Sequence, residues 1–255
     1  RELELLNHIF THVNVASFKN NPEAIIAEMD AFMARNHLTN IGEVKGRLVK
    51  NLITTHYPRA IIEVGAYIGY STLHFASALK SNLLIPTAEK KYIAVEESPL
   101  FASIALSLVN LAGLLDLVQV TVGRSPDSLR NLKSQVPRVD VLFLAGNKPL
   151  HTDDLKIVEE MGIIGVGSLV VADNVMKAGY RRYVRYVRMG VGQKLLAAEK
   201  VRIAEEEGRA DVGEWEKGGD PSLVYESGVL RSSIPTGIPD AIEVTMCIGR
   251  VDEDE

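Results

Sequence analysis

The sequence predicts an α/β fold in which helices cover both faces of a doubly wound, mostly parallel, seven-stranded sheet. From Arg59 onward, short apolar and often β-branched runs alternate with stretches of helical spacing. Most of these runs end at a glycine or a polar residue, which is typical of buried parallel strands. The chain has 255 residues and 46% of them are hydrophobic, so it can bury a sizeable core. We therefore expect residues 1–255 to form a single domain.

Composition excludes several classes of protein. The net charge of −5 provides no basic footprint, so we expect no nucleic-acid partner. The single cysteine, Cys247, lies in an apolar alternation and is expected to be a small buried residue, which leaves no disulfide within the chain. No apolar run approaches the roughly 18 residues of a membrane span. We expect a cytoplasmic protein with no membrane partner, and its oligomeric state is not predictable.

The N-terminal residues 1–57 are expected to form a helical cap. Helical spacing of apolar residues predicts helices within 3–10, 22–33 and 44–53. The second helix has proline in its first turn, where proline is favoured. Residues 36–46, NHLTNIGEVKG, are polar and contain glycine, which predicts a loop. This loop either closes over the glycine turn described below or is an ordinary connector.

The cofactor-binding core is expected to span residues 58–190. Five apolar runs predict its parallel strands: RAIIEV, KYIAVE, VQVTVG, RVDVLFLAG and GSLVVADNV. Helices are expected between them, and right-handed crossovers then place the carboxyl ends of all five strands at one edge of the sheet. Ligands of such sheets bind beyond that edge. Four segments converge there: Gly65 to Ser71, Glu96, Ala145 to Lys148, and Asp173 with Asn174.

The first of these segments has the character of a ligand loop. Gly65 and Gly69 permit a sharp turn and a close approach of the backbone to a ligand, while Ser71 and the amides of the following helix can bind an anionic group. Glu96 ends the next strand, where doubly wound nucleotide folds place the carboxylate that binds ribose hydroxyls. Each feature alone also occurs in ordinary turns and surface acids, but the two together indicate a nucleotide-like ligand.

Beyond Met176 the pattern changes. The basic, aromatic run YRRYVRYVRMG predicts either a phosphate-contacting helix or a solvated helical face with buried tyrosine stems, and the acidic whole favours the second. Residues 191–219 are expected to form a charged, partly helical insertion. Residues 220–250 contain two expected strands, SLVYES and AIEVTMCIG, joined by a turn-rich segment.

Taken in order, the runs EVGAYIGYS, AVEESP, LVNLAGL, VDVLFL and VVADNV resemble those of catechol O-methyltransferases. The resemblance extends from about Asn36 to Asn174, returns at LVYES and AIEV, and is expected to be closest to fungal members. It implies a Rossmann-like, class I methyltransferase fold with an antiparallel last strand. It also implies S-adenosylmethionine as cofactor, Mg²⁺, and a small catechol or phenol as substrate.

The resemblance also implies roles for individual residues. The implied cofactor-binding residues are Ile41 over the cofactor, Glu63, Gly65, Tyr67 and Ser71 at its methionine end, Glu96 at the ribose and Ser125 near the adenine. Lys148 occupies the position of the general base, and Glu226 that of an acid that accepts a hydrogen bond from the unmethylated hydroxyl. The alternatives are a rim lysine in water and a solvent-facing glutamate. Asp173 and Asn174 match two oxygen ligands of the metal.

The sequence departs from the family pattern after the fourth strand. Ala145, Gly146 and Asn147 stand where the pattern has an aspartate, a histidine and an aromatic residue or histidine. Because that aspartate is the third protein ligand, we expect Mg²⁺ binding to be weak or lost. Asp153 and Asp154 begin the next helix and are not expected to replace it. Two functions remain open: an O-methyltransferase for a catechol or related phenol, and a degenerate relative that binds S-adenosylmethionine without methylating.

Overall fold

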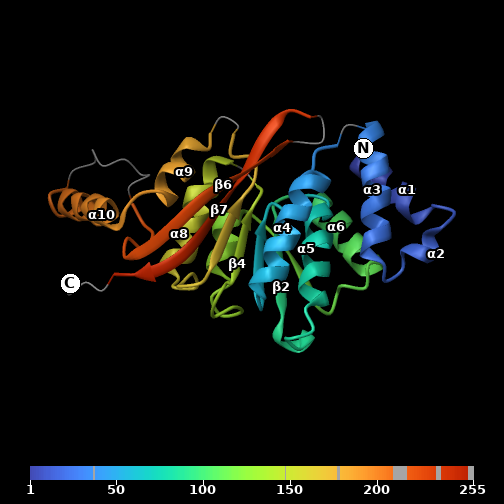
Figure 1. Cartoon of the computed structure of the whole chain (residues 1–255), viewed down its shortest axis with the longest axis horizontal. Coiled ribbons are helices and arrows are strands. Elements are labelled where there is room, and N and C mark those ends of the chain that lie inside the picture. The colour runs from blue at the N-terminus through green and yellow to red at the C-terminus, as the bar shows by residue number, and fades with distance from the viewer. Residues whose placement is uncertain (37, 147, 177–178, 209–216, 234–236, 252–255) are drawn as a thin grey trace.

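A single seven-stranded sheet organises the chain (Figure 1). The structure is a computed structural model that describes residues 1–251 except 37, 147, 177–178, 209–216 and 234–236. The strands are β1 (Ala60–Val64), β2 (Lys91–Glu96), β3 (Val118–Val122), β4 (Val141–Leu144), β5 (Leu169–Ala172), β6 (Leu223–Ser233) and β7 (Pro239–Arg250). Their order is β3-β2-β1-β4-β5-β7-β6. Strands β1 to β5 pair in parallel, whereas β7 is antiparallel to both of its neighbours, so the predicted fold class is confirmed.

Helices bury both faces of the sheet. They are α1 (Glu2–Phe10), α2 (Val15–Phe18), α3 (Pro22–Asn36), α4 (Gly42–His56), α5 (Tyr70–Ser81), α6 (Pro99–Leu111), α7 (Ser125–Arg130), α8 (His151–Glu160), α9 (Arg181–Val187) and α10 (Val191–Glu206), with short 3₁₀ helices η1 (Thr87–Glu89) and η2 (Lys148–Leu150). Ile61 and Phe143 pack with residues of α3 to α6 in one core, and Ile62 and Leu142 pack with residues of α7 to α9 in the other. Strand β1 is therefore buried along its whole length, as its continuous apolar run predicts.

The three predicted N-terminal helices are present as α1, α3 and α4, and α2 adds a single turn between the first two. Helix α4 begins at Gly42, so the last part of the predicted loop, GEVKG at residues 42–46, belongs to the helix. Its buried side is formed by Gly42, Lys45, Gly46 and Val49, whereas Val44 is 47% exposed. The loop prediction was wrong there because this helix buries glycines and a lysine, which carry no apolar signal.

The C-terminal part follows the sequence prediction more closely. The tyrosines of α9 and its N-cap are buried, and Cys247 is fully buried in β7. The two predicted antiparallel strands form one long hairpin, and α10 lies at the end of the molecule opposite the N-terminal helices (Figure 1). Within the described part of the chain, no helix combines the length and the apolar character needed to cross a membrane.

Candidate active site

The carboxyl ends of four strands, β1, β2, β4 and β5, lie at one edge of the sheet, which we call the rim. The rim residues are Gly65 to Ser71, Glu96, Ala145, and Asp173 with Asn174. Parallel pairing sets Val64 beside both Val95 and Leu144, and Leu144 beside Ala172. The next residues continue the pairing, since Gly65 N donates to Val95 O at 2.9 Å and Asp173 N donates to Leu144 O at 3.0 Å. The structure therefore brings together the segments that the sequence predicted to converge.

The glycine turn between β1 and α5 requires residues in the left-handed region. Gly65 has φ +90°, and a Cβ there would lie 2.4 Å from the Cα of Gly146. Tyr67 also has a positive φ of 49°, which is uncommon for a residue with a side chain. Gly69, at φ +87°, is the N-cap of α5, and among the described residues no side-chain hydrogen bond caps this helix. Its first-turn amides are therefore available to an anionic group.

Glu63 lies behind the first turn of α5. It is fully buried and accepts hydrogen bonds from the hydroxyls of Ser71, of Thr72 at 2.6 Å and of Tyr92 at 2.8 Å. Burial raises the pKa of the Glu63 carboxyl, and these three donors oppose that rise. Glu63 thus positions Ser71 and Thr72 in the first turn of α5, and its place at the methionine end of the cofactor stays a prediction.

Glu96 is held at the rim by the backbone. One carboxylate oxygen accepts from Tyr67 N at 2.7 Å and the other from Ser98 N at 2.9 Å, and the side chain is 9% exposed. A carboxylate oxygen has two lone pairs, so each oxygen can accept one more hydrogen bond. The Tyr67 hydroxyl donates to Glu2 at 2.6 Å, which ties α1 to the turn. Glu96 is therefore fixed in orientation and still able to bind a diol such as ribose.

Ser125 and Ile41, the other predicted cofactor residues, lie on either side of this turn in sequence. Ile41 is 5% exposed, immediately precedes α4 and packs in the core on that face of the sheet. Ser125 begins α7, and its hydroxyl donates to Asp154 at 2.7 Å. The second carboxylate oxygen of Asp154 is buried without a partner among the described residues, and burial raises the pKa of this carboxyl to about 7. The sequence showed Asp154 only as a first-turn acid of α8, so its pairing with Ser125 was missed.

Asp173 is paired with a buried lysine. Lys45, which is 0% exposed on α4, donates to Asp173 at 2.6 Å and to Asp240 on β7 at 2.7 Å. Asn174, with φ 61°, donates its backbone N–H and its side-chain amide to the two oxygens of Asp173, each at 2.7 Å. Burial raises the pKa of Asp173, and the Lys45 ammonium opposes that rise. One ammonium therefore links α4, the end of β5 and β7.

These residues do not fit a magnesium ion. Mg²⁺ requires several oxygen ligands in near-octahedral geometry. Ala145 supplies no donor, and both oxygens of Asp173 are engaged by Lys45 and Asn174. The ammonium of Lys45 supplies a positive charge where the resemblance implied a cation. This pairing could not be predicted from the sequence, because a lysine in a predicted loop is normally solvated.

Among the described residues, one group of three His, Asp or Glu side chains is close enough to share a metal, and it lies on the N-terminal cap. The ligand atoms of His8, His12 and Glu28 are within 4.8 Å of one another. However, Nδ1 of His12 accepts from Asn14 N at 3.1 Å, so the proton of the neutral ring is on Nε2. His8 Nε2 lies 2.6 Å from Glu28. This cluster is arranged for hydrogen bonding, and metal-ligating histidines normally donate from their second nitrogen.

Lys148 follows β4 as the first residue of η2, next to the rim in sequence. Its side chain lies outside the described part of the structure, so its role as general base stays a prediction. The nearby His151 is fully buried. Its Nδ1 lies 2.8 Å from the Tyr180 hydroxyl and its Nε2 lies 3.4 Å from Gly146 O. His151 thus connects the segment that carries Lys148 to the start of α9.

The prediction that Glu226 lies at the rim was wrong. Glu226 pairs with Met246, which in turn pairs with Leu169, the first residue of β5. Asp173 follows the other end of β5, so Glu226 lies in the sheet near the edge opposite the rim. There it is exposed in a groove with Leu52 of α4. The displacement arises because β6 does not end after LVYES but continues to Ser233.

Comparison with known proteins identifies the family to which these features belong. The family model described as O-methyltransferase matches residues 17–204. The chain is 31% identical to the catechol O-methyltransferase of Bos taurus over 191 residues, which are 74% of this chain and 66% of that protein. The chain thus spans slightly less than two thirds of this relative's length. The expected closeness to fungal members stays a prediction.

Solved structures share the fold. The O-methyltransferase TomG from Streptomyces achromogenes, solved in complex with SAM, aligns with a TM-score of 0.63 and 21% identity over 88% of this chain and 89% of that one. An O-methyltransferase from Bacillus cereus in complex with SAH aligns with a TM-score of 0.62 and 18% identity over 87% of this chain and 88% of that one. At these identities the likeness establishes the fold, which is that of class I methyltransferases.

Proposed function

Because the chain belongs to the O-methyltransferase family, we propose that it transfers the methyl group of S-adenosylmethionine to one hydroxyl of a catechol or a related small phenol. The observation that carries this proposal is the rim itself. There, Glu96 is oriented by two backbone amides next to an uncapped helix N-terminus, in a chain whose relatives include catechol O-methyltransferases.

The described residues fit the cofactor. The first turn of α5, with Ser71 positioned by Glu63, would hold the methionine carboxylate, because uncapped amides and the helix dipole favour an anion. Glu96 would accept hydrogen bonds from the ribose hydroxyls, and Ser125 with Asp154 would lie near the adenine. When bound, S-adenosylmethionine supplies an electrophilic methyl group on a sulfonium.

We assign the acceptor side of the rim to Lys148, with the buried Lys45 behind it. Lys148 would take the phenolic proton, since a phenol with a pKa near 10 is mostly protonated at neutral pH. Lys45 keeps a positive charge beside Asp173, and we propose that the reaction depends weakly or not at all on Mg²⁺. Holding the phenol oxygen in line with the methyl group supplies the remaining acceleration.

A second candidate is a relative that binds the cofactor and does not methylate. Ala145 is the observation that favours it, because the position offers no ligand to a metal. The two candidates make the same prediction for cofactor binding and different predictions for turnover.

A labelled-methyl assay with a panel of catechols and monophenols, with and without Mg²⁺ or Mn²⁺, separates them. Methyl transfer that is nearly equal in both conditions supports our proposal, and Lys148→Met should then lower the rate by about 10² to 10⁴-fold. The exposed Lys133→Met serves as the matched control and should leave the rate unchanged. Calorimetric binding of S-adenosylmethionine without transfer to any acceptor would favour the second candidate.

A further inference from the structure

Beside the rim lies a pocket of about 1170 Å³ between α9 and α10. Val175 and Met176 are among its lining residues, and they directly follow Asn174 in the chain. The pocket therefore lies next to the proposed acceptor position. Residues at i, i+3, i+4 and i+7 on both helices line it: Arg181, Val184, Arg185 and Arg188 on one side, and Gln193, Leu196, Ala197 and Lys200 on the other.

The charge of this pocket opposes that of the protein. Among its described lining residues there are four cations and no acid, whereas the chain carries a net charge of −5. Arg188 is neutralised by Glu243, with which it forms two hydrogen bonds of 2.7 and 2.8 Å. Arg181 and Lys200 form no ion pair with any described residue. A cleft of one sign concentrates ligands of the opposite sign.

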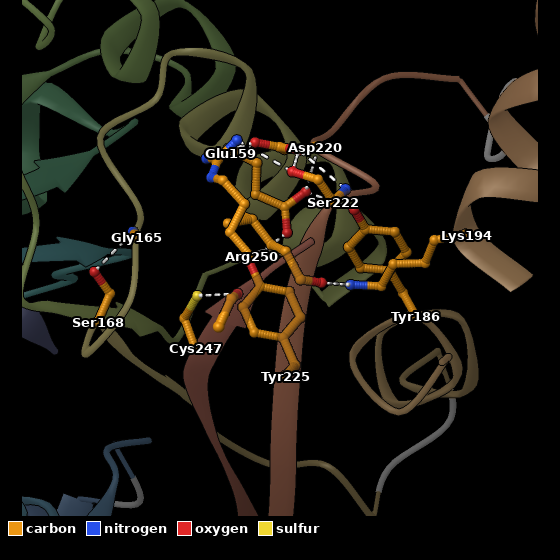
Figure 2. Close-up of polar contacts among 12 residues, drawn as sticks. Glu159, Gly165, Ser168, Tyr186, Lys194, Asp220, Ser222, Tyr225, Cys247 and Arg250 are labelled. Carbon is orange, nitrogen blue, oxygen red and sulfur yellow. Dashed lines mark hydrogen bonds and ion pairs between the residues drawn. The ribbon is translucent and has the colours of Figure 1, made fainter. Parts of the chain in front are cut away.

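The second wall of the pocket is fixed to the sheet. Lys194 of α10 is 4% exposed and lies over the rings of Tyr186 and Tyr225, 4.8 and 4.1 Å from their centroids. Its ammonium donates to Leu223 O at 3.3 Å. Figure 2 shows both tyrosine hydroxyls meeting at the buried Glu159, each at 2.5 Å. Helix α10 is therefore anchored to α8, α9 and β6, and the pocket is formed before any ligand arrives.

The lining that is not charged is largely apolar, with Met176, Val184, Met189 and Leu196 among its residues. Apolar walls with a few cations suit a ligand that has an apolar body and an anionic end. Guanidinium groups bind carboxylates and phosphates through paired N–H donors. Tyr183 and Tyr186 of α9 are buried, whereas Arg181 and Arg185 line the pocket. Arg182 is turned away and pairs with Asp153 of α8.

We propose that this pocket binds the anionic tail of the methyl acceptor, a carboxylate, sulfate or phosphate joined to the phenol by an apolar spacer. Arg181 and Lys200 supply its positive charge. The inference rests on the proposed function, because it assigns the substrate class of that same site. It predicts that acceptors with an acidic tail are preferred over their neutral esters.

The test uses calorimetry with the full chain saturated with S-adenosylhomocysteine, followed by methyl-transfer kinetics. The ligands are 3-(3,4-dihydroxyphenyl)propanoate, its methyl ester, and the corresponding phosphonate, which separates carboxylate from phosphate recognition. The acid or the phosphonate should bind about tenfold or more tightly than the ester. The double variant Arg181→Gln, Lys200→Gln should lose this preference, whereas Arg202→Gln, which removes a cation of α10 outside the pocket, should keep it.

Equal binding of acid and ester by the parent protein would overturn the inference. An unchanged preference in the double variant would also overturn it. If the acidic ligands bind selectively through these residues and no methyl transfer occurs, the pocket assignment stands and the proposed function fails. If transfer occurs without any preference for an acidic tail, the proposed function stands and the pocket assignment fails.

Discussion

Replacing Lys45 by methionine removes the ammonium that lies between Asp173 and Asp240. Both carboxylates are almost fully buried, at 3% and 1% exposure, and Lys45 is their common partner at 2.6 and 2.7 Å. The substitution keeps most of the length of the side chain and leaves two acids without their common counter-ion. We expect a large loss of stability, because uncompensated buried charges are costly.

Breaking a buried ion pair by removing one partner typically costs about 3 to 5 kcal/mol. In a protein of this size, about 1 kcal/mol shifts the melting temperature by roughly 2 to 4 °C, so Lys45→Met should lower Tm by about 6 to 20 °C. Lys133→Met, at an exposed position, should shift it by no more than about 2 °C. Urea and thermal unfolding of the three proteins measure this difference. A Lys45→Met variant that unfolds with the parent would refute our account of the buried ion pair.

The same lysine determines whether a magnesium site can be rebuilt. Ala145→Asp alone should not make methyl transfer respond to Mg²⁺, since Asp173 remains bound to Lys45. The double variant Lys45→Ala, Ala145→Asp removes the ammonium from Oδ1 of Asp173 and adds a second carboxylate, so Mg²⁺ should raise its melting temperature. For a dissociation constant of about 1 mM, 10 mM Mg²⁺ stabilises by about 1.4 kcal/mol. If Mg²⁺ changes the melting temperature of the parent and of both variants by the same amount, Lys45 does not control metal binding at this site.

Three further predictions follow from other residues. Gly65→Ala should abolish cofactor binding or folding, because its Cβ would lie 2.4 Å from the backbone of Gly146, whereas a Cβ at Gly146 meets atoms only at 3.5 Å, so Gly146→Ala should be tolerated. Calorimetry measures cofactor binding and circular dichroism measures folding. A Gly65→Ala variant that folds and binds like the parent would contradict the turn geometry. Glu96→Ala should weaken S-adenosylmethionine binding by about 10 to 100-fold, as measured by calorimetry, and equal binding would remove the ribose assignment. Burial lowers the pKa of His74 from 6.5 to about 4, so the unfolded state binds the proton first and stability falls as the pH drops from 6.5 to 4. His74→Phe should remove about 3 kcal/mol of that pH dependence in urea unfolding, and parallel profiles would contradict it.

The fold was predictable because its signals are local. Each of the five parallel strands is a short apolar run, and each is followed by a helical stretch, so the order of elements and the position of the rim follow from the sequence alone. The start of α4 was not predictable. Its buried side contains Gly42, Lys45 and Gly46, residues that become buried only through contacts with distant strands.

The site was predictable where residue type and position coincide. Glu96 and the glycine turn lie at strand ends, so a pattern could place them. Glu226 could not be placed, because Gly228 interrupts the strand pattern and conceals that β6 continues. The pairings of Lys45 with Asp173 and of Ser125 with Asp154 join residues 128 and 29 positions apart, and no spacing rule links them. A strand end can be predicted from sequence, but a partner across the fold cannot.

The ammonium of Lys45 differs from a metal ion in how it could interact with the hydroxyl groups of an acceptor. A divalent cation with vacant coordination positions can coordinate both oxygens of a vicinal diol, and a chelator can remove the cation. An ammonium has three N–H donors, and Lys45 directs two of them at Asp173 and Asp240. It cannot chelate a diol, and because it is covalently attached, its occupancy does not change with the concentration of divalent ions. On the proposed function, a rim built around such a fixed charge requires no second hydroxyl, so we expect simple monophenols to be accepted as well and turnover to be unaffected by EDTA.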